Sequence, residues 1–159
     1  MELEKLSFGV GDRFAHQAAS QLAAFERIAK DGVVVIPVWN KSNREHTFIG
    51  SHPESVLLAG KSAIAEAGWK HGWHVDADHI RLDTVDRFLP HSDFFTIDVA
   101  ESIGQRGADS DLQAFVDRHP ELLGSIQIEG VPKPLQIDRN DFLEIAAKYF
   151  RAVQEAGKI

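Results

Sequence analysis

The hydrophobic positions of this chain form short segments typical of strands, separated by stretches in which apolar residues recur at helical spacing. Four segments predict strands, at residues 6–10, 33–39, 73–77 and 94–97. The segment at 33–39 is continuously apolar and rich in β-branched residues, as in a parallel strand that is covered on both faces.

Between these strands the spacing predicts two helices and a short third one at 84–89. The first helix ends at Gly32 and the second at Gly68, and Ser51 with Glu54 forms a capping-box pattern at the start of the second. The buried faces are Ala18, Leu22, Phe25 and Ala29 in the first helix, and Val56, Gly60, Ala63, Ile64 and Ala67 in the second. The alternation of strands and helices indicates a parallel α/β sheet with right-handed crossovers.

The pattern changes after residue 98. Ser110 predicts the start of a helix that stops before Pro120, and alternation at 126–128 and 135–137 predicts an inserted β-hairpin. The last helix carries one apolar face: Phe142, Ile145, Ala146, Tyr149, Phe150 and Val153.

Composition narrows the possible functions. A chain of 159 residues with 43% hydrophobic residues can bury a real core as one domain. The absence of cysteine excludes disulfides, thiolate nucleophiles and cysteine-bound zinc. A net charge of −7 argues against a nucleic-acid surface. No apolar run reaches the roughly 18 residues of a membrane helix, so we expect a cytoplasmic protein with no membrane contact.

The most informative motif is the segment 74–79, His-Val-Asp-Ala-Asp-His. Asp76 and Asp78 share one face of an extended strand, and His79 lies just past them. Carboxylate and imidazole ligands together suit Mn, Zn, Co, Ni or Fe. An equally good interpretation is structural, because carboxylates at strand ends often cap helices or bind loop amides.

Other polar residues fall at the same place in the pattern, the carboxyl ends of the predicted strands. Asp12 and Arg13 follow the first strand, Asn40 and Lys41 the second, and Asp98 the fourth. In parallel α/β folds that edge binds ligands, so these groups are candidates for one site.

Two of these groups have alternative interpretations. Asp98 with Glu101 favours a helix N-cap over a functional role. The polar stretch from Asn40 through Arg44 to His46 is either a loop over the site or a plain surface loop. Asp12 and Arg13 favour function, because the preceding glycines let the backbone approach a ligand.

Three separated segments, at 6–14, 75–79 and 94–98, resemble the tagaturonate epimerase family, metal-dependent enzymes that interconvert tagaturonate and fructuronate. The resemblance extends through 37–42 and the final helix. Family members are much longer and their fold resembles a TIM-type barrel. The resemblance therefore implies that 1–159 is a single α/β domain, the N-terminal half of a longer barrel enzyme. It would hold about four parallel βα units, a hairpin insertion and a C-terminal helix.

The resemblance also implies residue roles. Catalysis would fall to Asp12 and Asp76, and a divalent metal ion (Mn, Zn, Ni, Co or Fe) would bind to Asp78 and His79. The hexuronate substrate would bind to Arg13, Asn40, Lys41, Arg44 and Asp98.

The two sugar acids differ at a carbinol carbon that is not adjacent to the ketone, so enolisation cannot invert it. Retro-aldol cleavage and recombination is the preferred route, with transient oxidation as the alternative. Two other functions stay open: a metal-assisted hydrolase, and a non-catalytic half-barrel that binds sugar acids. Because the outer strands of a half-barrel are exposed, we expect a homodimer or a complementing C-terminal half.

Overall fold

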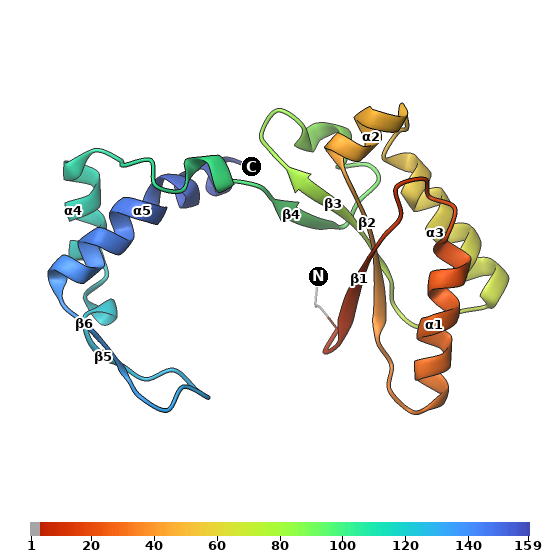
Figure 1. The fold of residues 1–159 in the computed structure, drawn as a ribbon, viewed down its shortest axis with the longest axis horizontal. Coiled ribbons are helices and arrows are strands. Elements are labelled where there is room, and N and C mark those ends of the chain that lie inside the picture. The colour runs from red at the N-terminus through yellow and green to blue at the C-terminus, as the bar shows by residue number, and fades with distance from the viewer. Residues whose placement is uncertain (1–3) are drawn as a thin grey trace. The chain divides into compact units, whose positions relative to one another are not determined.

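The computed structural model describes residues 4–159, and contacts divide the chain into two compact units that meet in sequence between Asp98 and Val99. The elements of both units are drawn in Figure 1. The first unit holds the parallel sheet with its helices, and the second holds two α-helices and a hairpin. The expectation of one α/β domain over 1–159 stays a prediction.

Four parallel strands form the sheet of the first unit: β1 Ser7–Gly11, β2 Ile36–Ser42, β3 His74–Ile80 and β4 Phe94–Ile97. They lie in chain order, so each strand pairs with the next one. Between them run α1 Ala18–Lys30, α2 Asn43–Ile49, α3 Glu54–Ala67 and the 3-10 helix η1 Val85–Arg87. The predicted parallel α/β sheet is confirmed, and its membership of a TIM-type barrel stays a proposal.

Helices α1 and α3 pack against each other on one face of the sheet (Figure 1). They bury an apolar core that contains Leu22, Phe25, Trp39, Val56, Ala63 and Val75. Trp39 is 2% exposed, and its Nε1 donates to Gln21 Oε1 at 3.0 Å. A Cβ at Gly60 would lie 3.1 Å from the Trp39 ring, so the glycine lets α3 pack close to the sheet.

Strand β2 begins and ends three residues later than the apolar segment predicts. Ile36 pairs with Ser7 of β1, and its N–H donates to the carbonyl of Leu6 at 3.0 Å. Val33 and Val34 precede the strand and are 45% and 39% exposed. The β-branched run indicated a strand but not its ends, because pairing with β1 decides where the ladder starts.

A helix that the sequence pattern did not predict, α2, follows β2 directly. The hydroxyl of its N-cap, Ser42, accepts from the Glu45 N–H, and the Glu45 carboxylate accepts from the Ser42 N–H. The capping box predicted at Ser51 does not form. Helix α3 starts after Pro53 and has no side-chain cap. The predicted C-cap at Gly68 is confirmed by its φ of 64°.

Strand β3 runs to Ile80, three residues beyond its predicted end at Ala77. Its pairing with β4 changes register between these two residues, and His79, within the irregularity, has a φ of 52°. The helix predicted at 84–89 is reduced to the single 3-10 turn of η1.

The second unit contains the 3-10 helices η2 Ala100–Ser102 and η3 Pro120–Leu122, α4 Asp109–Arg118, β5 Gly124–Ile126, β6 Leu135–Ile137 and α5 Arg139–Lys158. The antiparallel pairing of β5 with β6 confirms the predicted hairpin. Its buried core is Leu112, Val116, Phe142 and Ala146. Across residues 4–159, no helix combines the length and apolar character needed to cross a membrane.

Three predictions about helix starts and burial after residue 97 are wrong. The N-cap of η2 is Val99 rather than Asp98, and that of α4 is Ala108 rather than Ser110. Both predictions used side-chain type alone, whereas the cap position is set by where the backbone turns helical. Three apolar residues predicted for the buried face of α5 are 43–63% exposed: Ile145, Tyr149 and Val153.

Gly60→Ala should lower the free energy of unfolding by about 1–3 kcal/mol, because its methyl group would crowd the Trp39 ring in a packed core. At a solvent-exposed position inside a helix, replacing glycine with alanine instead raises the free energy of unfolding by up to about 1 kcal/mol. Gly157→Ala is the matched control, since a Cβ there meets nothing within 4 Å. Urea titration followed by tryptophan fluorescence and circular dichroism measures both. Stabilisation by both changes would contradict the close approach of α3.

Candidate functional site

Polar and apolar residues alternate between the two faces of the sheet near the carboxyl ends of β2 and β3. Trp39 and Val75 belong to the core that packs against α1 and α3. Because side chains alternate along a strand, Asn40 and Asp76 lie on the opposite face. The two are direct neighbours in the pairing of β2 with β3.

Asn40 lies against the two glycines of β1. A Cβ at Gly9 would come within 3.3 Å of Asn40 Nδ2, and one at Gly11 within 3.0 Å of Asn40 Oδ1. The glycines therefore leave the space that the amide fills. The prediction that Asn40 and Lys41 follow the strand is wrong, since both lie within β2.

Asp76 is buried, and one oxygen of its carboxylate has no partner. The residue is 6% exposed, and Thr96 Oγ1 donates to its Oδ2 at 2.8 Å. No hydrogen-bond partner for Oδ1 exists among residues 4–159. Burial raises the pKa of Asp76, and the nearby charge of Asp78 raises it further. A carboxyl group in this setting can carry a proton or bind a ligand through Oδ1.

His79 lies near the end of β3 between two carboxylates. Its Nε2 is 3.9 Å from Asp78 Oδ2, and its Nδ1 is 3.8 Å from Asp98 Oδ2. Arg81 Nη2 is 3.3 Å from the same oxygen of Asp98. The register change with β4 and the φ of 52° at His79 both occur at this point of β3, and strand irregularities of this kind are common near binding sites.

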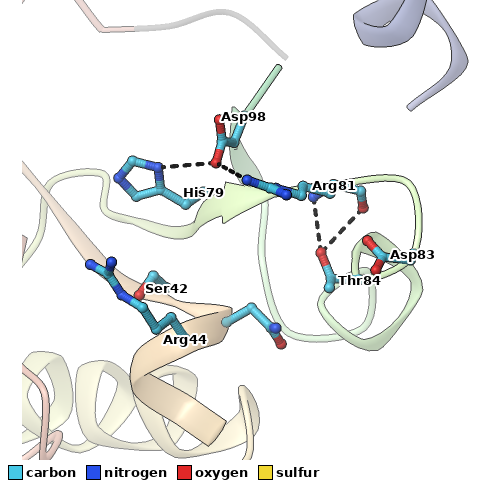
Figure 2. Close-up of a pocket in the computed structure, with 8 residues that line it drawn as sticks. Ser42, Arg44, His79, Arg81, Asp83, Thr84 and Asp98 are labelled. Atoms are coloured by element: carbon cyan, nitrogen blue, oxygen red, sulfur yellow. Dashed lines mark hydrogen bonds and ion pairs between the residues drawn. The ribbon is translucent and has the colours of Figure 1, made fainter. Parts of the chain in front are cut away.

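A pocket of about 450 Å³ opens beside His79 (Figure 2). Its lining residues are Ser42, Asn43, Arg44, His79, Arg81, Asp83, Thr84 and Asp98. Three of them, Arg44, His79 and Asp98, were predicted as site residues. The others were missed because α2 was not predicted and because β3 was expected to end before residues 81–84.

Arg44 reaches the pocket from the first turn of α2 (Figure 2). The side chain of its neighbour Asn43 is already hydrogen-bonded: Arg87 Nη1 donates to Asn43 Oδ1 at 2.8 Å. Within the part of the chain that the structure describes, no carboxylate pairs with the Arg44 guanidinium. Arg44 is therefore available for charge-assisted hydrogen bonds to an anionic ligand.

Asp12 and Arg13, both predicted site residues, lie outside this pocket. Asp12 Oδ1 accepts from the N–H of Phe14 at 3.1 Å, and Oδ2 accepts from the N–H of Gln17. These bonds hold the loop that leads into α1. Arg13 pairs with Glu45 of α2 at 3.3 Å. The proposed roles of both residues in binding and catalysis stay predictions.

Lys41 also lies outside the pocket and is only 1% exposed. Its Nζ donates to Ser51 Oγ at 2.8 Å, and that oxygen is 2.9 Å from Nδ1 of the buried His46. Burial lowers the pKa of Lys41. Burial, with the charges of Lys41 and Arg87, lowers the pKa of His46 to about 4, so its imidazole is neutral at pH 7. These polar contacts connect α2 and the segment between α2 and α3 to β2.

The predicted metal ligands, Asp78 and His79, are close to each other, with Asp98 on the other side of the imidazole. Their mixed oxygen and nitrogen donors suit Mn, Zn, Co, Ni or Fe. Among residues 4–159, however, no three His, Asp or Glu side chains are grouped so that they could hold a metal ion. The donor types fit a divalent cation, but the described residues do not complete its coordination.

The four-stranded parallel sheet with helices between its strands defines an α/β protein, and its polar pocket lies at the edge where such sheets commonly carry ligand sites. The family model for UxaE, tagaturonate epimerase, matches residues 1–159. The chain therefore belongs to the tagaturonate epimerase family, as its sequence resemblance indicates.

Solved structures of fructuronate-tagaturonate epimerase UxaE from Cohnella laeviribosi share this fold. The native form is 20% identical in sequence, and two forms complexed with glycerol are 18% identical. Each has a TM-score of 0.71, and the match covers 94% of this chain and 32% of the solved one. The chain thus spans about a third of the length of these structures. None of the curated proteins matches it.

The neutral, buried His46 should make the fold sensitive to mild acid. The unfolded histidine binds a proton near pH 6.5 and the folded one only near pH 4, so stability falls as the pH drops between these values. His46→Gln should reduce that slope by up to about 1.4 kcal/mol per pH unit. Urea titrations across this pH range measure the slope, with His16→Gln, at an exposed position, as the control. An unchanged slope in His46→Gln would contradict the assignment.

Proposed function

We propose that this chain forms part of a sugar-acid epimerase that interconverts tagaturonate and fructuronate. The observation that carries the proposal is the match of the family model to residues 1–159. The pocket supports it, because both substrates are anions and no carboxylate among residues 4–159 pairs with Arg44. The chain spans 32% of the solved relatives, so the complete site requires further polypeptide, from a complementing segment or a second copy. A cytoplasmic location and a partial TIM-type barrel of about four βα units belong to the same proposal.

Substrate binding is assigned to the pocket side of the sheet. Arg44 binds the hexuronate carboxylate through two parallel hydrogen bonds, a geometry that suits guanidinium. Asp98 and Asn40 are assigned to the sugar hydroxyls. Lys41, buried and bonded to Ser51, acts instead by holding α2 in place.

The proposed reaction is retro-aldol cleavage followed by recombination. A base removes the proton from the hydroxyl group on the carbon to be inverted, and the bond to the carbon next to the ketone breaks. This gives an aldehyde and an enediolate. Rotation of the aldehyde and re-formation of the bond returns the proton and yields the epimer. Asp76 is the proposed proton carrier, because its Oδ1 has no hydrogen-bond partner in the described part of the chain and its raised pKa favours proton exchange. Asp12 is a weaker candidate, since both of its oxygens bind backbone N–H groups.

Asp78 and His79 are proposed to supply a carboxylate oxygen and an imidazole nitrogen to a divalent cation, with the remaining ligands from polypeptide outside this chain. When bound, such a cation would provide positive charge against the enediolate oxygens. Asp98, near the other ring nitrogen of His79, orients the imidazole.

A non-catalytic role, in which this chain only binds sugar acids, is the second candidate. It would apply if the chain, which matches 32% of the length of the solved relatives, acts without the remaining polypeptide. No observation favours the hydrolase alternative.

Replacing Arg44 should weaken the binding of tagaturonate. Arg44→Met should raise the dissociation constant by about tenfold or more, since one charge-assisted pair is worth roughly 1.5–3 kcal/mol. Arg44→Lys should restore only part of the affinity, because a lysine cannot make the bidentate contact. Calorimetric titration measures the affinity, with Arg27→Met, on the exposed side of α1, as the control. If Arg44→Met binds tagaturonate with unchanged affinity, the substrate carboxylate does not bind to Arg44 in this pocket.

Conversion of tagaturonate to fructuronate should require a divalent cation and both proposed ligands. Adding Mn, Ni, Co or Zn should support conversion by the protein with its complementing polypeptide, and a chelator should stop it. Asp78→Asn and His79→Ala should abolish the reaction while leaving the circular dichroism spectrum unchanged. Asp31→Asn, far from the pocket at the end of α1, is the control. Substrate binding without conversion under all these conditions would favour the non-catalytic candidate.

A further inference from the structure

A histidine ring lies between two carboxylates at the start of β3, outside the pocket of the candidate site. His74, the first residue of the strand, is 6% exposed. Its Nε2 is 2.9 Å from Glu4 Oε2, and its Nδ1 is 2.9 Å from Asp93 Oδ2. Glu4 precedes β1 and Asp93 precedes β4, so the imidazole connects three segments that are far apart in the sequence.

Both ring nitrogens of His74 face acceptors, so the two contacts together require a protonated ring. A carboxylate only accepts hydrogen bonds, a neutral imidazole carries one N–H group, and an imidazolium carries two. Burial alone would lower the pKa of His74. The hydrogen bonds and charges of Glu4 and Asp93 outweigh burial and raise this pKa above its ordinary value of 6.5.

The other groups around the ring do not take the place of either carboxylate. Strand β2 sets Val38 beside His74, and β4 sets the Phe94 ring near it, with 6.2 Å between the ring centroids. Asp76 follows on the same face of β3, and its carboxylate accepts from Thr96. The protonation of His74 therefore depends on Glu4 and Asp93.

The two carboxylates are held unequally. Asp93 Oδ1 also accepts from the N–H of Val75 at 2.8 Å, and the Asp93 N–H donates to the Val75 carbonyl at 3.1 Å. Among residues 4–159, the Glu4 carboxylate is bonded to His74 and to its own backbone N–H, and the side chain is 36% exposed. A neutral ring can keep one donor, so the contact that breaks on deprotonation is the one to Glu4.

Gly72 leaves the space that the Glu4 carboxylate occupies. A Cβ at Gly72 would collide with Glu4 Oε1, which is the far end of a flexible side chain. Trp69 Nε1 donates to the Gly72 carbonyl at 3.0 Å and holds this turn in place. A methyl group at residue 72 would therefore displace the Glu4 carboxylate rather than the backbone.

We propose that His74 is a pH-dependent bridge that holds the segment before β1 to the start of β3. The protonated ring donates to Glu4 and Asp93 at once. When the ring loses its proton, the Glu4 carboxylate turns to solvent and the chain before β1 is released. The local stability that the bridge contributes is fully present below pH 6.5, and it is lost as the pH rises through the higher pKa of the folded protein. This device does not depend on epimerase activity.

Nuclear magnetic resonance of the histidine ring protons measures the pH at which His74 titrates in the full chain, with His74→Gln used to assign its signals. The titration should lie above pH 6.5 and should move to lower pH in Glu4→Gln, which removes one of the two negative charges. Gly72→Ala should move it in the same direction while all three charged groups remain in the chain. Glu129→Gln, in the exposed loop between β5 and β6, is the matched control and should leave it unchanged.

Hydrogen exchange, corrected for the intrinsic effect of pH, measures the release. A peptide that spans residues 4–11 should exchange about threefold faster or more above the titration of His74, as expected for the loss of a partly exposed ion pair. In Gly72→Ala it should exchange at the faster rate on both sides of that titration. Circular dichroism verifies that each variant is folded.

Three results overturn the proposal: titration of His74 at or below pH 6.5, an unchanged titration in Glu4→Gln or Gly72→Ala, or corrected exchange of residues 4–11 that is the same on both sides of the titration. A titration above pH 6.5 that both variants lower, with faster exchange above it, supports the proposal.

Discussion

The register of β2 against β3 is the constraint on which the candidate site depends. It sets Asn40 beside Asp76 and Ser42 beside Asp78. A slip of one residue would turn each of these side chains to the opposite face. The register is held by Trp39 and Val75, which alternate with the polar residues and are buried under α1 and α3. Hydrophobic packing on one face thus places the chemistry on the other.

The same alternation separates two buried ionisable groups with different consequences. Lys41 lies on the helix side, where its bond to Ser51, which also contacts His46 of α2, links β2 to α2 and to the segment before α3. Asp76 lies on the opposite side, where Thr96 satisfies one oxygen and no described group satisfies the other. Burying a polar atom without a partner lowers stability. Because the Lys41 ammonium has a hydrogen-bond partner within the fold and Asp76 Oδ1 has none among the described residues, Asp76 is the stronger candidate for contact with a ligand.

Periodicity predicted the order and type of most elements, including the β5–β6 hairpin and the faces of α1 and α3, except that Ala67, predicted to be buried, is exposed in the last turn of α3. It did not predict the ends of β2 and β3, which depend on pairing with neighbouring strands. The capping box was predicted at Ser51 but forms at Ser42 with Glu45, because the extension of β2 to Ser42 makes the chain turn there.

The candidate site shows the same limit. Arg44, His79 and Asp98 were predicted from their places near strand ends, and they line the pocket. Arg81 and Thr84 were not, because they follow a strand end that was placed too early. The buried contacts of Lys41 join residues ten positions apart, which no local pattern reveals.

The left-handed backbone at His79 has a consequence for how this protein could change. Its φ of 52° lies in a region that glycine enters without steric conflict, whereas a residue with a side chain is strained there by roughly 1–2 kcal/mol. Laboratory evolution that rewards heat resistance alone would therefore drift toward glycine at this position. Selection for thermal stability favours glycine at this position, whereas retention of the imidazole beside the pocket requires histidine.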